Sequence, residues 1–97
     1  MPQATNPIHT HLNRLLSTRA YPKTICPSEV ARAFSSSELA QLNASEWRDT
    51  MDDIRVVVWQ MRDRGEVDVL QKGEVLGMDI GREEVRGPIR VRKIQKS

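Results

Sequence analysis

Residues 45–65 read SEWRDTMDDIRVVVWQMRDRG, and this stretch decides the fold. Its apolar side chains recur at steps of three and four residues, at Trp47, Met51, Ile54, Val58 and Met61. This spacing is typical of a helix that buries one stripe and exposes the opposite face. Ser45 is a suitable N-cap, and Gly65 is a common stop after a last helical turn. The sequence therefore predicts a long amphipathic helix from Ser45 to Arg64.

After Gly65 the hydrophobic period changes from helical to two, which indicates strands. Val67 and Val69 alternate with Asp68 and Leu70, Lys72-Gly73 is a two-residue hairpin turn, and Val75-Leu76 begins the return strand. A loop with three glycines follows, with half a turn expected at Arg82 to Val85. In the last strand, Ile89 and Val91 share one face, while Arg90 and Arg92 share the other. These segments predict a small antiparallel sheet.

Upstream of residue 45 the pattern predicts two further helices with a short strand between them. Asn6 is expected to cap a helix that starts at Pro7 and ends near Arg19. Lys23 to Cys26 is β-capable, and a second helix runs from Pro27 to about Phe34. Ser35 to Glu38 has the form of a capping box that opens one or two turns over Leu39 to Leu42.

The order of elements is helix, short strand, helix, long helix, strand, turn, strand. This order predicts an α+β winged helix-turn-helix, in which three helices cover one face of a small antiparallel β-sheet. The domain is expected to span residues 7–94, with residues 1–6 and 95–97 disordered. A plain three-helix bundle with a loose tail, or another small α+β arrangement, remains an alternative.

Composition limits the class of protein. A chain of 97 residues is one domain, and 15 basic against 13 acidic side chains give a net charge of +2. A single cysteine, Cys26, fits a reducing compartment. The N-terminus has no signal-peptide pattern, and no apolar run is long enough to cross a bilayer. We therefore expect a cytoplasmic protein with no membrane association.

Basic side chains border the apolar stripe of the long helix and recur on the predicted wing and last strand. Cations in such places contact phosphates, and Arg can also donate two hydrogen bonds to guanine. The sequence thus predicts a module that binds double-stranded DNA, such as a transcriptional regulator that acts as a homodimer. The candidate nucleic-acid contacts are Arg48, Arg55, Trp59, Arg62, Lys72, Arg90 and Arg92.

Two other interpretations remain open. The arginines can simply belong to a solvated face of mixed charge, where Arg48 and Arg55 pair with Asp52, and where Arg90 and Arg92 pair with Glu66 and Asp68. Alternatively, the fold serves as a protein-interaction adaptor without nucleic acid. In that case the acidic sector of the long helix, or an exposed Trp59, would be the contact surface. We expect Trp59, at the edge of the apolar stripe, to pack under the wing or under the N-terminal helix.

The residues give no support for catalysis, a metal or another cofactor. His9 and His11 diverge on their helix, and Cys26 has no second cysteine at a ligand spacing. Neither histidine is placed by the pattern as a base for Cys26. The glycines form no phosphate-binding motif. We expect a protein that is not an enzyme.

Two segments make the chain resemble a known family. They are T24-I-C-P-S-E-V-A-R-A33 and R86-G-P-I-R90, supported by Trp47-Arg48 and by V69-L-Q-K-G73. The chain resembles, over about Leu12 to Lys93, short bacterial proteins of unknown function with a winged-helix-like fold. The resemblance implies a bacterial source and this fold, and it supplies no activity, cofactor or catalytic residue. The stretch from Ser35 to Ser45 is longer than is usual in that family.

Overall fold

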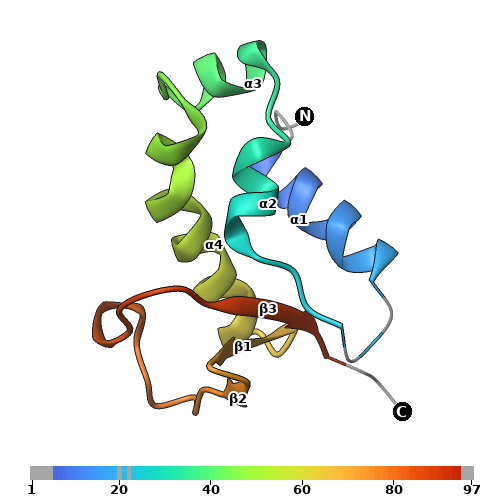
Figure 1. Ribbon diagram of the computed structural model, residues 1–97, viewed down its shortest axis with the longest axis vertical. Helices are drawn as coiled ribbons and strands as arrows, with labels where there is room; N and C mark the ends of the chain where they lie inside the picture. The colour runs from blue at the N-terminus through green and yellow to red at the C-terminus, as the bar shows by residue number, and fades with distance from the viewer. Residues whose placement is uncertain (1–5, 20, 22, 95–97) are drawn as a thin grey trace.

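A computed structural model describes residues 6–19, 21 and 23–94 (Figure 1). The predicted disorder of residues 1–5 and 95–97 lies outside these described residues. Asn6, also predicted to be disordered, instead has a defined role, because its Oδ1 atom accepts a hydrogen bond from the Ile8 amide at 2.8 Å. This contact caps the first helix, as the Asn6-Pro7 pair indicated.

Four α-helices and three strands follow one another in the described part of the chain. The first three helices are α1 (Pro7–Thr18), α2 (Pro27–Arg32) and α3 (Ser36–Gln41). A short 3₁₀ turn, η1 (Trp47–Thr50), leads into α4 (Met51–Asp63). The strands are β1 (Val67–Gln71), β2 (Glu74–Val75) and β3 (Arg90–Lys93), and a second 3₁₀ turn, η2 (Arg82–Glu84), lies in the β2–β3 loop. α2 ends two residues before the predicted Phe34.

The three strands form an antiparallel sheet in the order β2-β1-β3. Ile25 makes an isolated bridge to Val91, so the short segment before α2 lies along the free edge of β3. Lys72 and Gly73 both have positive φ, of 53° and 84°, as the two central residues of a tight hairpin turn often do. The hairpin predicted at Lys72-Gly73 is therefore confirmed.

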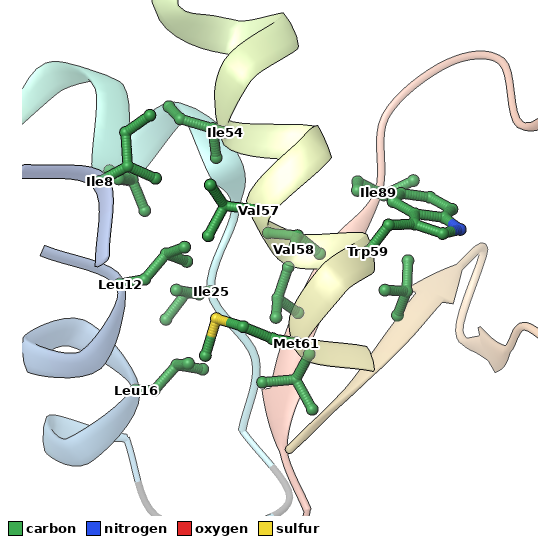
Figure 2. Close-up of a cluster of buried hydrophobic side chains, with 14 of the residues drawn as sticks. Ile8, Leu12, Leu16, Ile25, Ile54, Val57, Val58, Trp59, Met61 and Ile89 are labelled. Carbon is green, nitrogen blue, oxygen red and sulfur yellow. The ribbon is translucent and has the colours of Figure 1, made fainter. Parts of the chain in front are cut away.

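The core lies between the helices and the inner face of the sheet (Figure 2). Ile8, Leu12 and Leu16 of α1 face Ile54, Val57 and Met61 of α4, and Ile25 lies between them. Val67, Val69 and Val91 contribute the buried face of the strands. Helical and two-residue periods thus place their apolar side chains in one core, which confirms the α+β class. The arrangement is compatible with a winged-helix-like fold.

The start of the long helix differs from the prediction. Ser45 does not cap it; instead the Asp49 carboxylate accepts hydrogen bonds from the Ser45 and Glu46 amides, at 3.0 and 3.2 Å. The first turn is therefore 3₁₀ rather than α-helical. Trp47 and Met51 are half-buried rather than buried, while Ile54, Val57, Val58 and Met61 are buried as predicted.

The segment between α2 and α4 is fixed to α1 by a polar contact. Glu38 at the start of α3 lies 3.1 Å from His11 Nε2, and the His11 ring meets Phe34 edge-on at 5.4 Å between centroids. Glu38 also accepts from the Ser35 amide in the predicted capping box. Because of these contacts His11 is largely covered, although it was expected on the surface. Within the described residues, no helix has the length and hydrophobicity to cross a bilayer.

Candidate nucleic-acid interface

The exposed face of the long helix is acidic. Asp52, Asp53 and Asp63 of α4 are exposed together with Gln60, and Asp49 extends this face onto η1. These side chains repel a phosphate backbone, whereas a helix that enters a DNA groove presents donors and cations. We call Asp49, Asp52, Asp53 and Asp63 the acidic helix face. The arginines predicted to form a basic stripe on this helix, Arg48, Arg55 and Arg62, are not part of this face.

Arg62 was predicted to lie on the exposed basic stripe, and this placement is wrong. Its side chain is only 5% exposed. The guanidinium donates to the main-chain carbonyls of Gly77, Met78 and Ile80, and it also contacts Asp63. The β2–β3 loop folds over Arg62, and its carbonyl groups supply the acceptors that a buried guanidinium needs. A side chain held in this way is not available to a phosphate.

Trp59 is also buried, with 6% of the residue exposed, which agrees with its expected packing under the wing or the N-terminal helix. Figure 2 shows its indole pointing away from α1 and toward Ile89. The indole Nε1 donates to the Ile80 carbonyl at 3.2 Å. Trp59 therefore packs beneath the wing loop. It is neither a base contact nor an exposed protein-binding anchor.

The other two arginines of the predicted stripe lie closer to solvent. Arg55 is half-buried, and its Nη2 atom lies 3.4 Å from the Val85 carbonyl. Arg48 on η1 is exposed, with its guanidinium 4.5 Å from the Trp47 ring centroid and 3.1 Å from a Glu46 oxygen. Arg32 lies over the same ring at 4.8 Å. Neither Arg48 nor Arg55 forms its predicted pair with Asp52 among the described residues.

Two of the three basic residues predicted on the wing and last strand lie on β3, and the third lies at the β1–β2 turn. Arg90 is exposed and donates through Nε to the Thr24 hydroxyl at 2.8 Å, rather than to Glu66. Arg92 pairs with Asp68 at 2.8 Å, which confirms that predicted cross-strand pair, and it stacks on Tyr21 at 4.8 Å. Lys72 is exposed at the hairpin turn. Arg90 and Lys72 are thus accessible, while Arg92 is held by its partners.

Two recesses in the surface share Arg90 as a lining residue. The first, of about 490 Å³, is lined by Arg19, Lys23, Thr24 and Arg90. The second, of about 520 Å³, lies between the Lys72-Gly73 turn and residues 86–90. We call the five basic residues that line these recesses the basic sheet surface: Arg19, Lys23, Lys72, Arg86 and Arg90. Among the described residues that line them, none is acidic.

Sequence reasoning missed three members of this surface, Arg19, Lys23 and Arg86. Each lies in a loop or just beyond a helix end, where no period indicates the direction of a side chain. The bridge between Ile25 and Val91 brings the segment before α2, with Arg19 and Lys23, next to β3, and Arg86 lies in the loop that leads into β3. Within the described residues, Lys23, Lys72 and Arg86 make no salt bridge. They are the cations best placed to meet an anion.

The acidic group Glu29 contacts Arg19 of the first recess, and it is already engaged. Its carboxylate accepts from Arg19 at 3.0 Å and from the Cys26 amide at 2.8 Å. Burial raises the pKa of Glu29, but these hydrogen bonds and the charge of Arg90 outweigh it, so the pKa lies below its ordinary value. The charged carboxylate thus orients Arg19.

The chain belongs to the family described as protein of unknown function DUF3253, which it matches over residues 5–94. No curated protein matches the chain. The two segments that carry the resemblance, residues 24–33 and 86–90, meet at the basic sheet surface, since Arg90 donates to Thr24 and Ile25 pairs with Val91. The family description leaves the activity open.

Proposed function

We propose that this member of the family is a DNA-binding module that contacts the phosphate backbone through the basic sheet surface. One observation carries the proposal: the two adjoining recesses bring together five basic side chains, and no described acidic residue lines them. Clustered cations release condensed counterions when they meet phosphates, and this supplies sequence-independent affinity. Scattered charges on a solvated surface do not provide such a footprint.

The proposal changes which of the predicted residues make contact. Lys72 and Arg90 stay as contacts, and Lys23 and Arg86 join them. Arg92 lies two residues from Arg90 on the same face of β3, but its guanidinium is paired with Asp68. Arg62 and Trp59 hold the wing loop instead. Phosphate contacts position a protein on DNA but carry little sequence information, so we expect weak discrimination between sequences.

A titration of labelled duplex DNA at several salt concentrations tests this function. The informative variant is Lys72→Gln/Arg86→Gln, and the matched control is Arg14→Gln/Arg64→Gln, which removes the same charge from exposed positions elsewhere. The slope of log affinity against log salt should fall by about 2 in the first variant and by much less in the control. Absence of binding by the unmodified protein even at low salt would end the proposal.

A second candidate function follows from the acidic helix face. Asp49, Asp52 and Asp53 are exposed within a short stretch, and no described basic side chain forms a salt bridge with them. A basic protein partner fits this charge. The alternative predicts a complex that survives nuclease treatment and is lost in Asp52→Asn/Asp53→Asn. Unchanged capture by that variant would exclude this face as the docking surface.

We propose no catalytic role. Within the described residues, no group of three or more His, Cys, Asp or Glu side chains is arranged to hold a metal ion. The Cys26 sulfur lies 3.1 Å from the Ser28 hydroxyl, and neither described histidine contacts it. A thiol nucleophile needs a neighbouring base, which this geometry does not provide.

A further inference from the structure

The recess between the hairpin turn and residues 86–90 combines charge with small or apolar lining. Lys72, Arg86 and Arg90 contribute the cations, and Gly73, Gly87 and Pro88 contribute main chain and one ring. Its volume of about 520 Å³ is in the range of small-molecule binding sites. A purely phosphate-binding surface does not require a recess of this size.

The recess has a fixed wall. Gln71 Nε2 donates to the Arg86 carbonyl at 2.6 Å and lies 3.5 Å from the Pro88 carbonyl, so β1 holds the Gly87-Pro88 turn in place. Gly73 and Gly87 both have positive φ, of 84° and 89°, which favours glycine at these positions. Because neither residue has a side chain, a flat group can approach the main chain there.

We propose that this recess accepts one unpaired nucleobase of a bound nucleic acid, an inference that rests on the proposed function. A nucleotide combines a flat, largely apolar ring with a phosphate on either side, and the recess offers small lining residues beside three cations. Unstacked bases are bound by stacking on aromatic rings or on arginine guanidinium planes. Arg86 and Arg90 supply such planes here. A base inside a duplex is stacked and paired, so it cannot enter without being flipped out.

The test compares three duplexes that share one sequence apart from a central position. The first is fully paired, the second has a single unpaired thymidine, and the third has an abasic residue at that place. The phosphate charge near the site is the same in the last two. We expect the protein to bind the thymidine duplex roughly fivefold more tightly than the abasic duplex, the gain that stacking of one base provides.

A neutral substitution at a residue that lines the recess sharpens the comparison. Gly73→Asn adds a neutral side chain at a position where a Cβ atom would meet nothing within 4 Å, and Asn tolerates positive φ better than most residues. Gly65→Asn is the matched control, because its φ is 77° and its Cβ would also meet nothing. Only Gly73→Asn should remove the preference for thymidine, and both should keep the salt dependence of the parent protein.

The outcomes separate this inference from the function on which it rests. Equal, salt-dependent binding of the thymidine and abasic duplexes by the parent protein would overturn the base site and leave the DNA-binding function intact. A thymidine preference that persists fully in Gly73→Asn would also overturn it, because the base would then bind elsewhere. Failure of all three duplexes to bind would end the proposed function and this inference together.

Discussion

The Arg62 guanidinium donates to the main-chain carbonyl of Ile80, and this contact joins α4 to the wing loop. The same group also donates to the carbonyls of Gly77 and Met78, each at 3.2 Å. Arg62 Nε is buried with no partner among the described residues. A charged side chain on the predicted DNA-reading helix thus serves to position a loop. The loop therefore covers the face of α4 that carries Trp59 and Arg62.

Replacement of Arg62 by Ala should therefore destabilise the fold. The change removes charge-assisted hydrogen bonds from a side chain that is only 5% exposed to three loop carbonyls, at a cost of about 2–4 kcal/mol. The midpoint of thermal unfolding should fall by roughly 10 °C or more for a domain of this size. Circular dichroism during heating measures this. If Arg62→Ala unfolded at the parent temperature, the loop would not depend on this side chain.

The Arg92–Asp68 pair across β3 and β1 should contribute a small coupling energy. Both side chains are partly covered, with 16% and 24% exposed, and the pair shares one carboxylate oxygen with two guanidinium nitrogens. A double-mutant cycle with Arg92→Gln and Asp68→Asn should give about 1 kcal/mol by urea unfolding. A coupling indistinguishable from zero would show that solvent screens this pair fully.

Glu29 should make stability depend on acid pH. Its pKa is lowered, so the folded state favours the ionised carboxylate, and this stabilisation is fully present above the unfolded-state pKa near 4.5. It is lost as pH falls below that value through the lower pKa of the folded state. Compared with the parent, Glu29→Gln should have a flatter dependence of unfolding midpoint on pH between about 5 and 3. Parallel curves for the two proteins would contradict this role.

The hydrophobic periodicities predicted most of the fold, because burial determines both the spacing of apolar residues in the sequence and the packing of the elements. The helical spacing from Trp47 to Met61 and the alternation at Val67 to Val69 report which side of an element avoids water. The core contains the later residues of this set, from Ile54 onward, while Trp47 and Met51 pack against it half-buried. The 3₁₀ start of the long helix was missed. It depends on Asp49, whose carboxylate competes with Ser45 for the capping role, and spacing alone does not rank the two.

The candidate site was predicted less well, for a physical reason. An arginine beside an apolar stripe is exposed or buried according to what covers it, and here the β2–β3 loop supplies the carbonyls. No local pattern in residues 76–89 shows that they return to α4. Lys23 and Arg86 escaped notice because loop side chains lack a period, and long-range contacts of residues 24 and 25 with residues 90 and 91 bring their segments close.

The arginines of the long helix should contribute little to DNA affinity. Arg48 contacts Glu46 and Trp47, Arg55 contacts Val85, and neither arginine lines either recess. The variant Arg48→Gln/Arg55→Gln should reduce the salt slope by clearly less than the value of about 2 expected for Lys72→Gln/Arg86→Gln. An equal reduction of the salt slope in both variants would show that the long helix also contacts DNA.

The most direct measurement of the central claim is a map of backbone amide shifts by NMR as duplex DNA is added to labelled protein. Contact through the basic sheet surface should shift the amides of residues 19, 23–24, 72–73, 86–87 and 90, and leave exposed residues 52, 53, 60 and 63 of α4 unchanged. Shifts confined to those α4 residues, or none at DNA concentrations that saturate the salt titration, would contradict it.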